Sequence, residues 1–262
     1  HYPLRRQRQM CIRDRARAYE ELHVPALFEE WADPVLDAAG VQPGSRVVDV
    51  ACGTGVLARR ARQRVGKYGR VVGVDPGPGM LAVAEMLDPT VDWREGVAEA
   101  LPLPDASFDA VVSQFGMMFF TDRHGAVREM LRVLDEGGRI AVAVWDALEK
   151  HAAYAREVEI LDEVAGRDAG DALRAPFVLG NAEALGNVFR EAGVDQVRVD
   201  TRVGTARFPS IHTLVEADLR GWLPVMGVHL SEDKIQEILQ VAEHRMSDLV
   251  TEEGVVFDSP AH

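Results

Sequence analysis

The sequence predicts an α/β fold with a doubly wound, mostly parallel sheet and a helical lid. Between residues 46 and 145, five short apolar runs alternate with stretches of helical periodicity. The first run, 46–51, stops in the glycine loop 52–55, which opens directly into a helix. Strands that alternate with helices form a parallel sheet covered on both faces, because right-handed crossovers connect successive strands.

The individual elements follow from periodicity and turn residues. Strands are expected where short apolar runs end at turn signals, at 46–51, 71–75, 91–93, 108–114 and 139–145. Helices are expected where apolar residues recur every three to four positions, at 26–39, from 56 onward, at 78–87 and at 123–134. Later in the chain we expect a sixth strand at 196–203 and helices at 154–164, 182–192, 211–223 and 231–249, the last two forming the lid.

Composition excludes several classes of function. The 262 residues carry a formal net charge of -13, and an acidic surface repels phosphate, so no nucleic-acid partner is expected. No apolar run approaches the roughly 20 residues that span a bilayer. The two cysteines, Cys11 and Cys52, do not suggest a disulfide framework, which favours a reducing, cytoplasmic location. No Cys/His cluster has metal-ligand spacing, so no metal is expected.

The glycine loop indicates a nucleotide-like cofactor. Glycines after a buried strand let a ligand approach the backbone closely. Asp75 lies 20 residues after Gly55, at the end of the second expected strand, where a carboxylate can accept hydrogen bonds from both ribose hydroxyls. The alternative is that Asp75 forms the turn with Pro76 and Gly77.

Two cofactors fit the loop. Residues 53–58 satisfy the G-x-G-x-x-G/A fingerprint of dinucleotide-binding proteins, which keeps an NAD(P)-dependent oxidoreductase open. Asp49 favours the other cofactor, S-adenosylmethionine, because its negative charge suits an ammonium or sulfonium better than a pyrophosphate. Asp49 is equally explained by a structural hydrogen bond to the loop.

Several motifs in order then resemble one family. They are 49–55, 73–75 with Met80-Leu81, 96–109, 114–120, and 128–134 with Gly137-Gly138. Together, over about residues 18–146, they resemble the class I S-adenosylmethionine-dependent methyltransferases. Within that class they are most similar to the type 11 domain typified by the ubiquinone/menaquinone-biosynthesis enzymes. The resemblance implies a Rossmann-like methyltransferase fold, S-adenosyl-L-methionine as cofactor and methyl transfer as activity.

The resemblance also implies roles for single residues. The loop residues would pack on the methionine part, with Gln114 nearby, Asp75 would hold the ribose diol, and the adenine would lie among the residues after the second and third strands. The implied cofactor-binding residues, with Asp49 from its charge, are Tyr19, Asp49, Ala51, Gly53, Gly55, Asp75, Met80, Ala98, Glu99 and Gln114. Tyr19 would close over the cofactor, although simple packing explains Tyr19 equally well and helix-core packing is a plain account of Met80. Many relatives carry Asp where this chain has Val97, which weakens one expected adenine contact.

Three segments are expected along the chain. Residues 1–15 lack periodicity and resemble translated sequencing-adapter read-through at the ends of metagenomic gene predictions, so we expect a non-native leader. Residues 16–146 would form the S-adenosylmethionine-binding core, and 147–262 the sixth strand with the helical lid and substrate region. The family fold ends in an antiparallel seventh strand, and residues 255–262 stop about where it should begin. We therefore expect that strand to be truncated and the product to be destabilised.

Catalytic residues are not assigned by the sequence. Methyl transfer from a sulfonium needs orientation and a dry site more than a dedicated base. Should a base be needed, the candidates are His23, His124 and His151. The residues Phe115, Met118, Phe119, Trp145 and Trp222 suggest an apolar wall for a small, partly hydrophobic acceptor, or ordinary core packing. A protein that binds S-adenosylmethionine without turnover is the remaining alternative.

Overall fold

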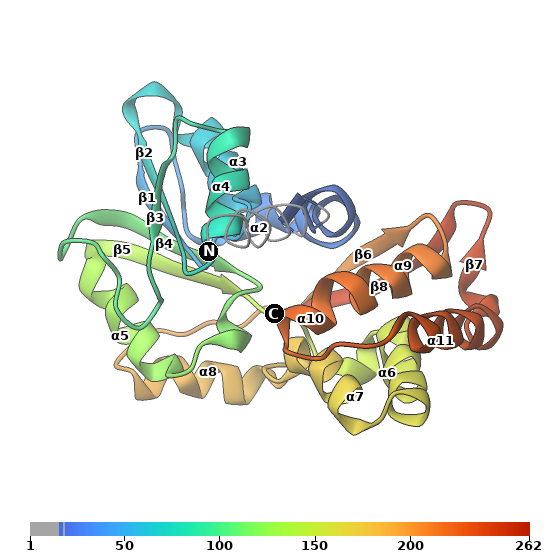
Figure 1. The fold of residues 1–262 in the computed structure, drawn as a ribbon. Helices are drawn as coiled ribbons and strands as arrows, with labels where there is room; N and C mark the ends of the chain where they lie inside the picture. The colour runs from blue at the N-terminus through green and yellow to red at the C-terminus, as the bar shows by residue number, and fades with distance from the viewer. Residues whose placement is uncertain (1–15, 18) are drawn as a thin grey trace, which may run out of the picture.

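A computed structural model describes residues 16–17 and 19–262 and shows two lobes that meet near the C-terminus (Figure 1). The first lobe holds a five-stranded parallel sheet in the order β3-β2-β1-β4-β5. Its strands are β1 (Arg46–Val50), β2 (Arg70–Asp75), β3 (Asp92–Glu95), β4 (Phe108–Gln114) and β5 (Leu134–Ala143). Strand order reverses between β1 and β4, which is where an open α/β sheet binds its ligand.

Helices cover both faces of this sheet. On one face lie α2 (Ala32–Ala38), α3 (Val56–Val65) and α4 (Pro78–Leu87), and on the other α5 (Arg123–Val133) and α8 (Ala182–Glu191) (Figure 1). Because both faces are covered, the central strands are rich in buried apolar residues: Val47, Val48 and Val50 of β1 are fully buried. The doubly wound parallel sheet predicted from the sequence is confirmed.

The N-terminal region is helical from Tyr19 onward. A π-helix, η1 (Tyr19–Phe28), leads through the 3₁₀ turn η2 (Glu29–Trp31) into α2. Pro25 lies inside η1 and has no N–H to donate, so regular α-helical bonding is interrupted there. The expected leader, 1–15, and Cys11 within it lie outside the described residues.

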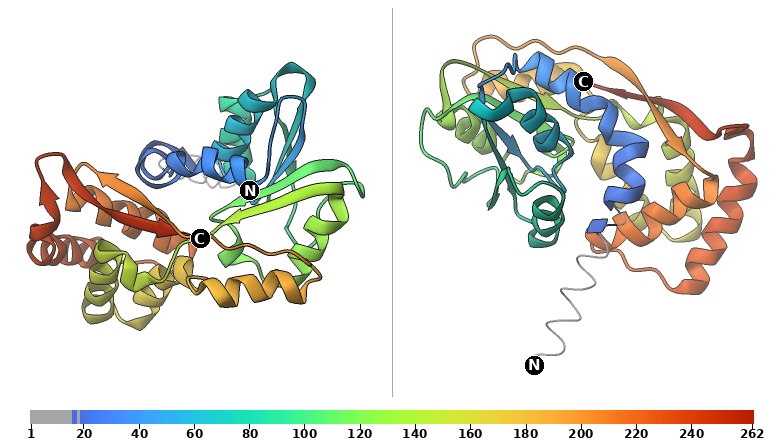
Figure 2. Two further views of the ribbon diagram at one scale, coloured as in Figure 1. Left: turned by 180° about the vertical axis from the view of Figure 1, so that it is seen from behind. Right: turned by 90° about the horizontal axis from the view of Figure 1, so that it is seen from above.

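The second lobe contains a smaller antiparallel sheet packed against helices (Figure 2). Its strands are β6 (Arg202–Phe208), β7 (Val250–Thr251) and β8 (Gly254–Ala261), in the order β6-β8-β7. The helices are α6 (Ala152–Val164), α7 (Arg167–Arg174), α9 (Ile211–Ala217), the π-helix η7 (Asp218–Trp222), α10 (Leu223–Val225) and α11 (Glu232–Arg245). Short 3₁₀ turns complete the two lobes at η3 (Gly66–Tyr68), η4 (Met117–Phe119), η5 (Leu148–Lys150), η6 (Ala175–Phe177) and η8 (Ser247–Leu249).

Among the described residues β5 is an edge strand of its sheet, so the expected truncation of the strand beside it stays a prediction. The antiparallel strand β8 lies in the second sheet. It pairs with β6 along its whole length, and reciprocal backbone hydrogen bonds of 3.1 and 2.9 Å join Val144, just after β5, to His262. Alternate residues Val255, Phe257 and Ala261 are buried, which is the period of a half-buried strand. The expectation of unpaired edges is therefore wrong for the sixth strand, because β8 pairs with β6, whereas β5 remains an edge strand of its sheet among the described residues.

The sixth strand begins later than expected. The sequence predicted it at 196–203, whereas β6 spans Arg202–Phe208. Val197 and Val199 alternate as in a strand but lie before it. The observed strand buries Gly204, Ala206 and Phe208. Gly204 has no side chain because the ring of Trp31 fills that space, at 2.5 Å from where a Cβ would lie.

Core packing under β4 gives a test of stability. Phe108 is fully buried in a cluster with Val111, Met130 and Val133, between the sheet and α5. We expect Phe108→Ala to lower the free energy of unfolding by about 3–5 kcal/mol, because a cavity replaces the ring. Tyr68→Ala is the control, since Tyr68 is 84% exposed, and should cost less than about 0.5 kcal/mol. Urea titrations that give equal losses for the two variants would contradict this packing.

Candidate functional site

Residues from three strand ends meet beside the glycine loop. A small cavity of about 50 Å³ lies there, and its lining includes the predicted site residues Tyr19, Asp49, Ala51, Gly53 and Gln114. Asp49 comes from β1 and Gln114 from the end of β4, the two strands at the switch in strand order. The structure thus brings together five of the ten predicted residues in one cavity.

Asp75 holds the loop in shape. Its Oδ2 accepts a hydrogen bond of 2.9 Å from the Gly53 N–H, and its Oδ1 accepts one of 2.7 Å from the Gly77 N–H. Burial raises the pKa of the Asp75 carboxyl, and these two backbone hydrogen bonds oppose the rise. The turn-forming interpretation of Asp75 is therefore correct for the bond to Gly77, and the ribose role stays a prediction.

The two loop glycines are needed for different reasons. Gly53 has a φ of +55°, and no atom lies within 4 Å of where its Cβ would stand, so its backbone faces open space. Gly55 has a φ of +87°, but a Cβ there would lie 2.3 Å from the ring of Trp93. Gly55 thus makes room for Trp93, a neighbour that the sequence analysis missed.

Unpaired oxygens gather at the small cavity. Asp49 is 1% exposed, and neither of its carboxylate oxygens has a hydrogen-bond partner among the described residues. The same holds for Thr54 Oγ1 and Gln114 Oε1, whereas Gln114 Nε2 donates to the Phe28 carbonyl at 2.8 Å. Buried acceptors without donors are costly, so this cavity is complementary to a ligand that donates hydrogen bonds.

Charge at the small cavity is negative. Burial raises the pKa of the Asp49 carboxyl well above its usual range, the backbone N–H of Ala58 opposes this rise, and the charge of Asp75 adds to it. A cation in the cavity would keep Asp49 ionised. The alternative for Asp49 is a structural hydrogen bond to the loop backbone. No donor among the described residues lies in hydrogen-bond geometry with either of its carboxylate oxygens.

Tyr19 lies on η1 and covers the loop. Its ring stacks on Phe28 and His23, with centroids 5.4 and 5.6 Å away. Burial, followed by the charges of Asp75, Glu20 and Asp49, raises the pKa of its phenol. Tyr19, Phe28 and Phe115 line both the small cavity and a larger one, so these rings separate the two.

The remaining predicted residues are more dispersed. Met80 lines the larger cavity together with Gly77. Ala98 is buried in the core, and Glu99 accepts hydrogen bonds from the Thr121 N–H (2.8 Å) and the Asp122 N–H (3.2 Å), just before α5. Neither Ala98 nor Glu99 lines either cavity, and their place at the adenine edge stays a prediction.

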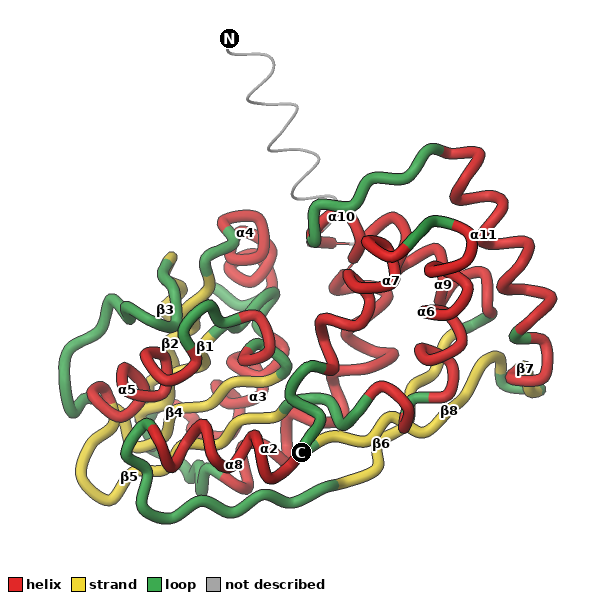
Figure 3. Tube along the Cα trace, turned by 90° about the horizontal axis from the view of Figure 1, so that it is seen from below, coloured by secondary structure: helices red, strands yellow, loops and turns green. Residues whose placement is uncertain are grey.

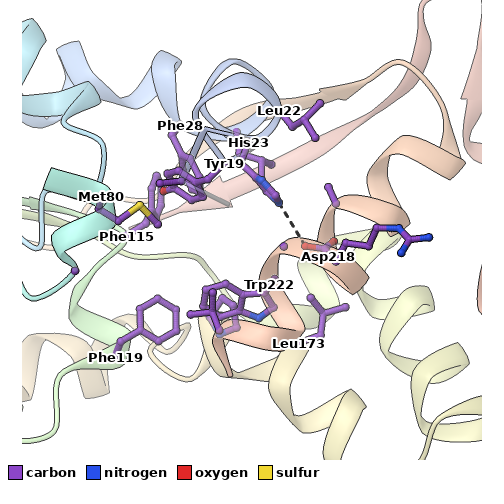
Figure 4. A pocket seen from close by; sticks show the side chains of 18 of the residues that line it. Tyr19, Leu22, His23, Phe28, Met80, Phe115, Phe119, Leu173, Asp218 and Trp222 are labelled. Carbon is purple, nitrogen blue, oxygen red and sulfur yellow. Dashed lines mark ion pairs between the residues drawn. The ribbon is translucent and has the colours of Figure 1, made fainter. Parts of the chain in front are cut away.

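Figure 3 shows the two lobes from below. The larger cavity, of about 630 Å³, is lined by residues of both lobes and walled by aromatic side chains (Figure 4). The apolar wall predicted from the sequence lines it: Phe115, Met118, Phe119, Trp145 and Trp222. Phe115 stacks on Trp145 with centroids 3.6 Å apart. Cavities of this size and apolar character commonly bind small molecules.

The three candidate histidines have different surroundings. His23 lines the larger cavity, with Nε2 3.7 Å from Asp218 Oδ1. His124 pairs with Glu191 at 3.0 Å on the surface. His151 is fully buried, and burial lowers its pKa to about 4. Only His23 among them lines the cavity, and the sequence analysis overlooked its partner Asp218.

The structure also bears on metals and membranes. Among residues 16–17 and 19–262, no three His, Cys, Asp or Glu side chains are grouped as metal ligands. None of the helices in this part of the chain has the length and apolar character needed to cross a bilayer.

The middle of the chain matches a known family. Residues 48–142 match the family model described as "Methyltransferase domain". This stretch is similar to methyltransferase domains. It is 42% identical over 118 residues to the ubiquinone/menaquinone biosynthesis C-methyltransferase UbiE of Hahella chejuensis, covering 43% of this chain and 47% of that protein. The relative from Cronobacter sakazakii is 35% identical over 153 residues, 53% of this chain and 61% of its own length. The chain thus spans about half the length of the curated relatives it matches.

Solved structures confirm the fold around this stretch. The YcgJ protein of Bacillus subtilis superposes with a TM-score of 0.57 at 20% identity, covering 88% of this chain and 95% of that one. The [4+2]-cyclase SpnF superposes with a TM-score of 0.52 at 21% identity, covering 89% and 79%. Because one structural neighbour is named a cyclase, the fold alone does not decide the reaction.

The unpaired charge of Asp49 gives a test with a definite sign. Burial raises the folded-state pKa above the unfolded value of about 3.9, so the ionised carboxyl destabilises the ligand-free fold as pH rises through that window. We expect Asp49→Asn to unfold with a free energy about 1–2 kcal/mol higher than wild type near neutral pH, with a gap that shrinks towards pH 4. Denaturant titrations across that range measure the gap. A variant that is less stable at every pH would show that Asp49 has a stabilising partner.

Proposed function

We propose that this protein transfers a methyl group from S-adenosyl-L-methionine to a small, partly hydrophobic molecule. The observation that carries the proposal is the buried Asp49 carboxylate, unpaired among the described residues, beside the open backbone of Gly53. The methionine part of the cofactor carries an ammonium group, which supplies both the positive charge and the hydrogen-bond donors that this cavity lacks.

The other implied residues fit the same cofactor. Asp75 has a free lone pair on each oxygen beyond its two backbone hydrogen bonds, which suits a ribose diol. Met80 would lie against the adenine, with Ala98 and Glu99 near its edge. The bound cofactor would supply an electrophilic methyl group on sulfur, and the protein would orient it and exclude water.

The larger cavity would hold the acceptor. Tyr19, Phe28 and Phe115 stand between it and the small cavity, so both reactants would meet at an aromatic, water-poor boundary. Much of its wall comes from residues after 142, beyond the stretch that matches the family. The acceptor named for the UbiE relatives is therefore not carried over to this chain. We further propose a cytoplasmic location, because Cys11 and Cys52 do not suggest a disulfide framework, and no nucleic-acid partner, because the chain is acidic.

Calorimetry with the purified full chain tests the cofactor. We expect S-adenosyl-L-methionine to bind saturably and NAD to give no heat. Asp49→Asn should weaken binding about tenfold or more, because a charged hydrogen bond is lost. Asp75→Ala should also weaken it. Asp195→Asn, a change of the same charge at an exposed residue, is the control and should bind as wild type does.

The outcomes separate the alternatives. Tight NAD binding without S-adenosyl-L-methionine binding would select the oxidoreductase. Saturable S-adenosyl-L-methionine binding with no methyl transfer to any acceptor in a broad panel would select a binding protein without turnover.

A further inference from the structure

A buried acid lies in the wall of the larger cavity and is not used by the cofactor site. Asp218, the first residue of η7, lines this cavity and is only 4% exposed. Its Oδ1 faces His23 Nε2 at 3.7 Å, which is too long for a hydrogen bond (Figure 4). Among the described residues, Asp218 Oδ2 and His23 Nδ1 have no hydrogen-bond partner. Two polar side chains thus face the cavity, and each has one hydrogen-bonding atom without a partner among the described residues.

A second acid, Glu157, lies next to Asp218, but only Asp218 lines the cavity. Glu157 on α6 is fully buried, does not line the cavity, and interacts with Asp218. Burial raises the pKa of Glu157 well above its usual range, and the charge and hydrogen bonding of Asp218 raise it further. Burial therefore favours the neutral form of Glu157, which leaves Asp218 as the acid of the pair that lines the cavity.

No Lys or Arg side chain in the described wall of the cavity is available to neutralise Asp218. Arg220 is the only Lys or Arg among the described residues that line the cavity. Its guanidinium is already bound by Glu216 at 2.8 Å and by Glu232 at 2.6 Å. Glu216 also lines the cavity, so the carboxylates there outnumber the one paired cation.

The rest of the wall suits a cation with an apolar body. Aromatic rings attract ammonium groups through their faces, and Tyr19, Phe28, Trp145 and Trp222 all line the cavity. A buried acid beside aromatic rings with an oxygen that is unpaired among the described residues, such as Asp218 Oδ2, stabilises a protonated amine far better than a neutral or anionic group. The volume of about 630 Å³ leaves room for an apolar body of one or two fused rings.

We propose that the larger cavity binds a hydrophobic molecule that carries a protonated amine, with Asp218 accepting a hydrogen bond from the ammonium group. That this molecule is the methyl acceptor rests on the proposed function. The binding itself does not, because it depends only on residues of the cavity wall.

Two matched probes test the binding, without cofactor. They are 2-naphthylmethylamine, which is a cation at neutral pH, and 2-naphthylmethanol, which has nearly the same shape without the charge. We expect the wild-type chain to bind the amine at least about tenfold more tightly than the alcohol in calorimetry. Equal affinities, a preference for the alcohol, or no binding of either probe would overturn the proposal without any variant.

Three variants test whether the preference for the amine over the alcohol depends on Asp218. Asp218→Asn keeps the shape and should reduce the preference for the amine to less than about twofold. Glu157→Gln should retain the preference, because Glu157 does not line the cavity and the change leaves Asp218 in place. Asp195→Asn, an exposed change of the same charge, should also retain it. Thermal unfolding checks folding, and Asp218→Asn should be no less stable than wild type because it relieves a buried acid pair. A folded Asp218→Asn variant that keeps the full preference would show that Asp218 is not the recognition group.

The result is separable from the test of the cofactor. An amine preference that depends on Asp218, found in a chain that does not bind S-adenosyl-L-methionine, would leave this inference standing and remove the proposed function. The reverse result would leave a methyltransferase whose acceptor is not an amine.

Discussion

The site depends on one carboxylate that holds two turns at once. Asp75 accepts backbone hydrogen bonds from Gly53 in the first loop and from Gly77 in the second. These bonds fix the ends of β1 and β2 relative to each other at the edge of the sheet. The backbone of Gly53 is thereby held open, with nothing near its missing Cβ. A loop that is already shaped before the ligand arrives loses little entropy on binding.

A second constraint joins the lobes. The hydrogen bonds between Val144 and His262, together with the pairing of β8 and β6, attach the second lobe directly to the end of β5. Phe115 and Trp145 stack close to this junction, and the larger cavity opens beside them. The position of the cavity is thus set by backbone pairing, and its aromatic wall is drawn from both lobes.

Sequence patterns predicted the parallel sheet well, because buried valine runs and glycine turns are strong local signals. They also predicted five residues of the small cavity, since strand ends of a parallel sheet converge. They failed where the decisive contact is remote in sequence. The space beside Gly204 is filled by Trp31, so β6 has a weak local pattern, and Gly55 is explained only by Trp93. Asp218 resembles any helical acid until the fold brings it to the cavity.

The rings shared by the two cavities have a thermodynamic consequence. Tyr19, Phe28 and Phe115 contact whatever occupies either space, and two of them come from η1, whose bonding Pro25 interrupts. Any ligand that changes how these rings are held alters the affinity of the other cavity, and linkage requires that effect to be equal in both directions. A ligand that shifts these three aromatic side chains in one cavity would therefore change the affinity of the other without any change in the sheet.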